Sequence, residues 1–333
     1  MQGPFGGGLS SVELVTAVGK AGGLGSFGVH HLTGPQILAT EQAIRQGSAA
    51  PFALNLWVPL GPEWPEVSDQ QWAQALKLLA PAFSELNLPP PDKPQGTQVW
   101  PSYDDQIEAV LAARPAVFSF VFGIPSPSIL GRCRALGIST VGAATTVAEA
   151  VALEEAGVDM VVATGCEAGG HRVAFLQPPE ANLIGTLALV PQVCDAVRNP
   201  VIAAGGISDR RGVAAALALG AEAVQMGTAF LACDESAAGD LHRQALFSPL
   251  AQHTTLTKGF SGRLARGLRN PLLETLQAQP DDILPYPVQN WLTGQLKRAA
   301  QTQGRGDLMS LWAGQAAPVL RHHTVPELMM ALE

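Results

Sequence analysis

Short runs of apolar and β-branched residues alternate with helical patterns along most of the 333-residue chain. Eight such runs are candidate strands: residues 2–5, 24–29, 52–58, 116–122, 139–143, 159–163, 201–204 and 223–226. Several helical segments between them carry end signals, such as Ser208 before one helix and Gly220 after it. Apolar strands separated by helices are typical of parallel strands buried on both faces. The pattern therefore predicts a (β/α)8 TIM barrel, with an open doubly wound sheet as the alternative, because periodicity does not count strands reliably.

Two stretches depart from this alternation. Residues 86–102 are rich in proline and predict a long surface excursion after the third strand. Residues 237–305 show several helical patterns and no convincing buried strand, and they predict a small helical subdomain that covers the barrel mouth. The barrel would then comprise residues 1–236 and 306–333, with the tail 307–333 returning as its last helix. The loops at 59–103 and 237–305 are expected to be irregular and to shape the pocket.

Composition excludes several classes of partner. Only 14% of the residues are charged, the formal net charge is −8, and Lys and Arg do not cluster, which argues against nucleic acid and anionic membranes. No stretch approaches the ~20 apolar residues that span a bilayer, and the amino end lacks the features of a signal peptide. The four cysteines are far apart, so we expect no disulfide framework, no zinc site and a cytoplasmic protein. The low charge is also compatible with burial in a homo-oligomer.

One predicted strand, 159–163, runs into a glycine-rich loop that holds a single histidine, His171. Gly165, Gly169 and Gly170 are expected to let the backbone approach a flat ligand closely. At the carboxyl end of a barrel strand, a neutral imidazole can act as a base or donate a hydrogen bond to an anionic substrate. Glu167 resembles a metal ligand, but no further His or Asp completes such a site, so we expect a structural carboxylate and no metal.

The region around the second predicted strand carries two weaker signals. Gly23, Gly25 and Gly28 satisfy the G-x-G-x-x-G pattern, but here a helix precedes the glycines and a strand follows them, which reverses the dinucleotide-binding context. We therefore assign these glycines to close packing of a helix on a strand. His30 and His31 end the strand, so one of them could face the barrel mouth.

The last two predicted strands both end in glycine turns. Gly205 and Gly206 follow strand 201–204 and precede a helix, and Gly227 and Thr228 follow strand 223–226. Backbone N–H groups at such positions bind anions, and (β/α)8 enzymes commonly bind a phosphate at the loops after strands seven and eight. The absence of a Walker lysine favours the phosphate of a cofactor over a transferred phosphate.

Taken together, these motifs resemble those of nitronate monooxygenases, formerly called 2-nitropropane dioxygenases. The segments that carry the resemblance are residues 3–7, 55–59, 122–125, 164–175, 203–209, 224–236, 254–270 and 313–315. They cover nearly the whole chain in order, and segments 55–59 and 254–270 favour the class I branch of the family.

The resemblance implies an FMN-containing (β/α)8 barrel that oxidises alkyl nitronates, such as propionate 3-nitronate, with O2 and without a nicotinamide. It implies that His171 addresses the substrate, by a hydrogen bond to the nitronate or by taking a proton from a neutral nitroalkane. The residues that would contact FMN are Asn55, Thr164, Gly169, Gly205, Gly206, Gln225, Met226, Gly227 and Thr228.

Four positions depart from the family pattern. Thr164 stands where class I members usually have a glutamine, Ala143 replaces a threonine, Phe5 a methionine and Val173 a glycine. These departures bear on substrate choice. Two alternatives stay open: an FMN-dependent NAD(P)H reductase of the enoyl-acyl-carrier-protein or quinone reductase type, which shares the glycine–histidine loop, and a flavin-binding barrel without activity.

Overall fold

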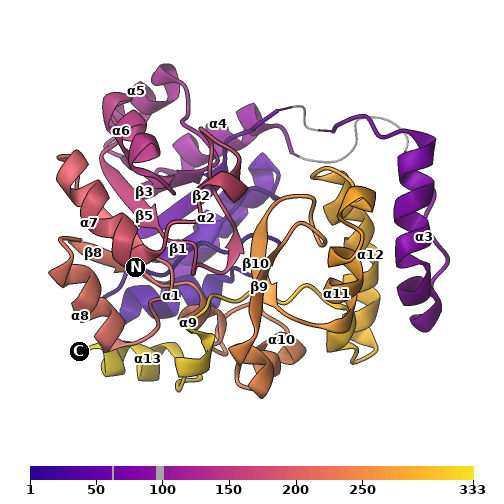
Figure 1. Cartoon of the computed structure of the whole chain (residues 1–333). Helices are drawn as coiled ribbons and strands as arrows, with labels where there is room; N and C mark the ends of the chain where they lie inside the picture. Colours follow the sequence, from indigo (N-terminus) through magenta and orange to yellow (C-terminus); the bar gives the residue numbers. More distant parts are fainter. Residues whose placement is uncertain (62–63, 95–100) are drawn as a thin grey trace.

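The computed structural model describes residues 1–61, 64–94 and 101–333, and it contains a parallel sheet that curls into a barrel (Figure 1). In spatial order the strands are β1 (Gly25–Gly28), β2 (Phe52–Trp57), β3 (Val117–Val121), β4 (Ser139–Ala144), β5 (Met160–Thr164), β7 (Val201–Ala204) and β8 (Ala223–Gln225). All neighbouring pairs are parallel, for example Gly28 beside Asn55 and Thr164 beside Ala204. The spatial order follows the chain order, as the predicted barrel requires.

The amino-terminal segment closes the barrel between β8 and β1. Gln2 forms a parallel bridge with Met226, the N–H of Gln2 donates to the Leu24 carbonyl at 2.9 Å, and that of Gly3 donates to the Met226 carbonyl at 2.8 Å. The (β/α)8 barrel is therefore confirmed. The predicted first strand 2–5 is wrong in extent, because Pro4 has no N–H to continue the ladder and the pairing stops after Gly3.

Helices cover the outer face of this sheet (Figure 1). They are α1 (Val12–Lys20), α2 (Gly34–Gly47), α4 (Tyr103–Ala113), α5 (Pro127–Ala135), α6 (Val147–Glu155), α7 (Thr186–Ala196), α8 (Arg210–Ala218) and α13 (Val325–Leu332). The tail returns as predicted, since α13 packs against α1 and α8. Gly25 allows β1 to approach α1, because a Cβ there would overlap the Val15 carbonyl oxygen. The packing of a helix on a strand is thereby confirmed for Gly25, and Gly23 likewise meets Val18 of α1, whereas Gly28 packs against the Phe5 carbonyl of the amino-terminal segment.

Side chains inside the barrel are small near its mouth. The inner cluster consists of Ala53, Val117, Val141, Ala143, Val162, Ile202 and Ala204, whereas the larger buried side chains lie between the sheet and the helices. Ala143 and Ala204, at the carboxyl ends of β4 and β7, leave room above the inner core. Because these side chains are small, they leave space for a ligand above them.

The remaining elements lie beside the mouth of the barrel. They are α3 (Asp69–Glu85), β6 (Gly170–His171), η1 (Pro179–Ala181), α9 (Thr228–Leu231), α10 (Asp240–Leu246), η2 (Pro249–Gln252), β9 (Thr254–Thr257), β10 (Ala265–Leu268), α11 (Pro271–Gln277), η3 (Pro280–Asp282), α12 (Val288–Thr302), η4 (Gly306–Leu308) and η5 (Ala317–Val319). The expectation that 237–305 contains no strand is wrong, because β9 and β10 form an antiparallel pair there. These strands are short and contain threonine, arginine and glycine, so they lack an apolar run.

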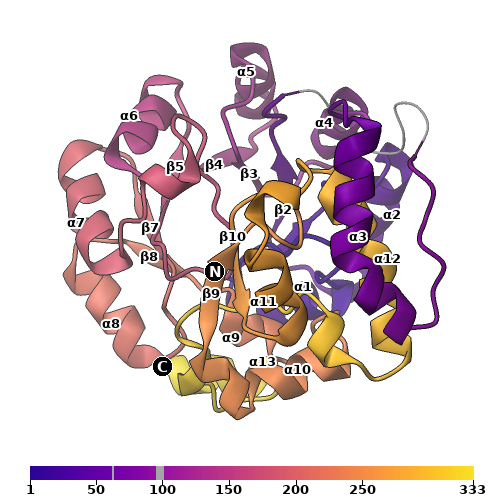
Figure 2. The same ribbon diagram turned by 45° about the vertical axis from the view of Figure 1, so that its right-hand side comes forward.

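Helix α3 corrects the expectation that residues 59–103 are irregular. Its buried face, which includes Trp72, Leu79 and Phe83, turns towards α11 and α12, and the rings of Trp72 and Trp291 lie 6.1 Å apart (Figure 2). Part of the proline-rich excursion, residues 95–100, lies outside the described residues. The division into a barrel and a subdomain stays a prediction. Within the described ranges, no helix combines the length and apolar character needed to cross a membrane.

Candidate active site

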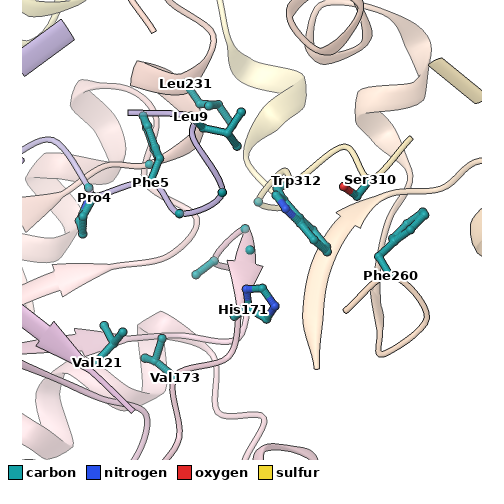
Figure 3. Close-up of a pocket in the computed structure, with 18 of the residues that line it drawn as sticks. Pro4, Phe5, Leu9, Val121, His171, Val173, Leu231, Phe260, Ser310 and Trp312 are labelled. Carbon is teal, nitrogen blue, oxygen red and sulfur yellow. The ribbon is translucent and has the colours of Figure 1, made fainter. Parts of the chain in front are cut away.

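A cavity of about 720 Å³ opens at the carboxyl ends of the barrel strands. Its floor is formed by residues at the ends of β2, β4, β5, β7 and β8, namely Asn55, Ala143, Thr164, Ala204 and Gln225. Figure 3 shows His171 at the end of β6, with Trp312 and Phe260 to one side and Val121 and Val173 to the other. This is where barrel enzymes place their chemistry.

Most of the predicted site residues meet at this cavity. The nine that line it are Asn55, Thr164, Gly169, His171, Gly205, Gly206, Gln225, Gly227 and Thr228. Met226 does not line it. The Met226 side chain is buried, its N–H donates to the Met1 carbonyl and its own carbonyl accepts from Gly3, so this residue serves barrel closure.

The loops after β7 and β8 have free backbone donors. Gly205 and Gly206 adopt φ values of +101° and +71°, and the N–H groups of Gly206 and Ile207 make no hydrogen bond to the described part of the chain. Thr228 Oγ1 accepts from the Gly314 N–H at 2.9 Å, which leaves the Thr228 hydroxyl proton available to a ligand. A Cβ on Gly227 would touch only Phe5, at 4.0 Å. These loops suit an anionic group such as a phosphate.

Two of the glycines near His171 are also required by packing, while Gly169 and Gly170 line the cavity and their expected role in ligand approach stays a prediction. A Cβ on Gly165 would overlap Thr186, and one on Gly169 would lie 2.6 Å from the Ala313 carbonyl carbon. Only Gly170, with φ of +75°, has open space around it. The loop is therefore held tightly by its neighbours.

Glu167 is a structural carboxylate, as predicted. Both of its oxygens lie 2.9 Å from the Thr186 N–H at the start of α7, and Oε2 also accepts from Thr186 Oγ1 at 2.9 Å. The same hydroxyl lies 2.8 Å from the Gly205 carbonyl oxygen. Glu167 and Thr186 thus tie the loop after β5 to the loop after β7.

Two further buried charges hold this loop, and sequence reasoning missed both. Arg172 is 2% exposed and donates to the carbonyls of Thr164 at 3.0 Å and Gly165 at 2.7 Å. Glu149 is 1% exposed and accepts from the Phe175 N–H at 2.6 Å. These charge-assisted hydrogen bonds fix the backbone around His171, although Nε of Arg172 is buried without a partner among the described residues.

The hydrogen bonds of His171 indicate its tautomer. His171 Nε2 lies 2.9 Å from Ser261 Oγ, and Ser261 Oγ also lies 3.1 Å from the Arg263 carbonyl oxygen. A serine hydroxyl has one proton, and the carbonyl can only accept, so Ser261 donates to Arg263 and accepts from His171 Nε2–H. This leaves Nδ1 with a lone pair, and Nδ1 makes no hydrogen bond to any described residue.

Aromatic side chains enclose His171. The centroid of its ring lies 5.2 Å from that of Trp57, 5.5 Å from Trp312, 6.2 Å from Tyr286 and 6.4 Å from Phe122. Phe122 adopts φ of +68°, an unfavourable conformation for a bulky residue that the surrounding contacts must hold in place. Sequence reasoning placed Trp57 and Phe122 in motifs but assigned them no contact with His171.

Burial keeps His171 neutral. The residue retains some accessible surface because it lines the cavity, yet it lies deep in the protein, and this burial lowers its pKa to about 3, with a further contribution from the charge of Arg263. His30 also lines the cavity, and its ring stacks on Trp57 at 4.0 Å. Burial and the neighbouring His31 lower the pKa of His30 to about 3.

A third buried histidine, His242, makes a testable contribution to acid stability. Its Nε2 lies 2.9 Å from the Trp312 carbonyl oxygen, and burial lowers its pKa to about 4. As the pH falls, His242 therefore takes up a proton in the unfolded chain before it does so in the folded protein. The free energy of unfolding thus falls as the pH drops from about 6.5 to about 4. We expect the free energy of unfolding to fall by about 2 kcal/mol more between pH 7 and pH 5 in the wild type than in His242→Gln. Urea unfolding at both pH values measures this difference, and equal losses in the two proteins would contradict it.

The four departures from the family pattern meet at one place. Phe5, Ala143, Thr164 and Val173 all line the cavity. Their positions agree with the expectation that they bear on the choice of ligand.

Comparison with known proteins agrees with this site. The family model described as nitronate monooxygenase matches residues 1–333. A probable nitronate monooxygenase from Bacillus subtilis (strain 168) is 40% identical over 320 residues, 95% of this chain and 89% of that protein. Another from Staphylococcus aureus (strain Newman) is 38% identical over 323 residues, 97% of this chain and 90% of that protein.

Solved structures give the same result. A nitroalkane oxidase from Streptomyces ansochromogenes has a TM-score of 0.90 and 37% identity, covering 99% of this chain and 93% of that one. FabK from Thermotoga maritima has a TM-score of 0.74 and 27% identity, covering 99% of this chain and 91% of that one. The chain belongs to the nitronate monooxygenase family of flavin-dependent oxidoreductases.

Proposed function

We propose that this protein uses FMN to oxidise alkyl nitronates, such as propionate 3-nitronate, with O2. One observation carries the proposal: the unpaired N–H groups of the loops after β7 and β8 and the neutral His171 open on the same cavity. An anionic cofactor anchored at these loops would lie in the same cavity as His171, the residue that would contact the substrate.

The residues present fit FMN. The donors of Gly206, Ile207 and Thr228 would hold its phosphate. Asn55, whose amide is oriented by donation to Ser119 Oγ at 3.0 Å, would hold the flavin ring together with Thr164. When bound there, FMN supplies electron transfer between substrate and O2, while the protein supplies position and electrostatics.

His171 would act on the substrate through Nδ1. Because Ser261 engages Nε2–H, the lone pair on Nδ1 is free to take the α-proton of a neutral nitroalkane. That transfer forms an imidazolium beside a nitronate anion, and the attraction between the two charges offsets the low basicity of His171. Ser261 is thus a positioning residue, and Trp57, Phe122, Tyr286 and Trp312 exclude water from the pair.

Visible spectra of the flavin-loaded protein test this function. We expect propionate 3-nitronate to change the flavin spectrum without O2 and to drive O2 consumption in air, whereas NADH and NADPH leave the spectrum unchanged. Rapid bleaching by a nicotinamide would instead support the reductase alternative. No response to either would support a flavin-binding barrel without activity.

A further inference from the structure

A side pocket of about 210 Å³ adjoins the main cavity. The two share His30, Trp57 and Tyr286 as walls. Beyond these rings, the side pocket is lined mainly by prolines and small apolar residues, and Arg263 is its one positively charged side chain among the described residues. Tyr103 and Gln106 also line it, and a lone cation among uncharged walls points to an anionic ligand.

The guanidinium of Arg263 is held in place without an acidic partner. It lies 4.2 Å from the centroid of the Tyr286 ring and 4.7 Å from that of Phe122, so both rings fix it by cation–π contact. Among the described residues, no carboxylate forms a salt bridge with it and no acceptor takes a hydrogen bond from it. Burial lowers its pKa, but an arginine stays charged at neutral pH.

Two neighbouring arginines show the contrast. Arg172 donates to backbone carbonyls after β5, and Arg266 donates to the Cys166 carbonyl at 3.0 Å and to Thr254 Oγ1 at 3.2 Å. Their guanidinium groups are used to hold the loop. Arg263 differs because its donors are left for a ligand.

The position of Arg263 is coupled to that of His171. Ser261 Oγ contacts both His171 Nε2 and the backbone of Arg263, so the Arg263 backbone is held next to His171, while the rings of Tyr286 and Phe122 hold its guanidinium. Trp57 and Tyr286, whose rings are in contact with centroids 5.9 Å apart, form a wall that the two cavities share, so a substrate whose nitronate lies at His171 must extend past the edges of these rings to reach the side pocket. An anionic group on such a substrate has to be separated from the nitro carbon by several bonds.

We propose that the side pocket is a carboxylate-binding subsite in which Arg263 selects nitronates that carry a distal carboxylate. A planar guanidinium binds a carboxylate through two parallel hydrogen bonds, and a single cation in a pocket with otherwise uncharged walls matches a single negative charge. Arg263 is therefore a specificity-determining residue. This inference rests on the proposed oxidation of nitronates.

A chain-length series tests the subsite. The substrates are the nitronates of 3-nitropropanoate, 4-nitrobutanoate and 5-nitropentanoate, each paired with the nitronate of equal length that lacks the carboxylate. In the wild type, we expect kcat/KM for at least one carboxylated nitronate to exceed that of its partner without the carboxylate by roughly 10- to 100-fold. Arg263→Met should reduce this ratio to near one, and Arg263→Lys should retain part of it, because it keeps the charge but loses the two-pronged geometry.

Lys297, the buried cation that lines the main cavity, provides the matched control. Lys297→Met should leave the ratio of the two kcat/KM values unchanged. If it lowers this ratio to near one instead, the carboxylate binds at Lys297 and the inference is overturned. Anaerobic calorimetry gives a second measure, the binding affinities for 4-nitrobutanoate and 1-nitrobutane. If Arg263→Met fails to fold, Arg263→Lys takes its place in this measurement. If the wild type oxidises none of these nitronates, the proposed function fails. If it oxidises them all without a carboxylate preference, the subsite alone fails.

Discussion

Replacing His171 with glutamine is expected to lower kcat/KM for a neutral nitroalkane by roughly 10²- to 10⁴-fold, the usual contribution of a general base. The preformed nitronate needs no proton removed, so its kcat/KM should change far less. Glutamine suits this test because its amide can still donate to Ser261 Oγ, while its amide oxygen is too weakly basic to replace Nδ1 as the proton acceptor. Steady-state O2 consumption with 1-nitropropane and with its nitronate gives both values.

The pH profile adds a second expectation for the same residue. Because the pKa of His171 is lowered to about 3, the imidazole stays unprotonated at every pH well above that value. Protonation of His171 should therefore produce no fall in kcat/KM between pH 8 and pH 5 for the neutral nitroalkane. An acid limb with a midpoint near the ordinary histidine value of about 6.5 would show that His171 is more exposed in solution than the structure indicates.

His242→Gln is the matched control, since His242 is also buried and neutral but does not line the cavity. Its activity on both substrates should resemble that of the wild type. If His171→Gln lowers both activities equally, His171 acts on the nitronate and not on the α-proton. If the wild type has no activity on a neutral nitroalkane, the assignment of a base is contradicted outright.

The barrel could be predicted from the sequence because its strands are buried on both faces. Runs such as those of β5 and β7 are almost entirely apolar, and the helix signals are local side-chain caps, with Thr146 capping α6 and Asp209, one residue after the predicted Ser208, capping α8. Strands β9 and β10 gave no such signal. Their residues are held by pairing with each other and with β6, a long-range contact that no local pattern reports.

The site was predicted in part for a similar reason. The glycine loops and His171 follow strands directly, so their place at the mouth is set by the barrel itself. Ser261, Arg263 and Tyr286 reach His171 from about 90 to 115 residues further along the chain, through the β9–β10 region. Helix α3 is different, because its buried residues are spaced as in an amphipathic helix and could have been recognised. It was not predicted because the proline-rich sequence that follows it led to the assignment of an irregular loop.

Substituting alanine for Gly165 is expected to destabilise the protein by roughly 2–5 kcal/mol, combining overpacking with the loss of charged hydrogen bonds. The new Cβ would overlap Thr186 N and Oγ1 as well as Glu167 Oε2. Gly165 cannot move away easily, because its N–H donates to the Ala204 carbonyl and its own carbonyl accepts from Arg172. Urea unfolding of Gly165→Ala, with an unchanged slope against urea, measures the loss.

Two comparisons make this expectation specific to the contact with Thr186. Gly131→Ala, inside α5 with no atom within 4 Å of the added Cβ, should stabilise the protein by about 0.5–1 kcal/mol. Thr186→Ala removes the nearest clashing atom and the hydroxyl bonds, so its cost should be smaller in the Gly165→Ala background than in the wild type. A coupling above about 0.5 kcal/mol in this double-mutant cycle supports a direct clash. If the two destabilisations are strictly additive, Gly165 is required for its backbone conformation alone. The loop that carries His171 is then held by Arg172 and Glu149 without help from the Glu167–Thr186 pair.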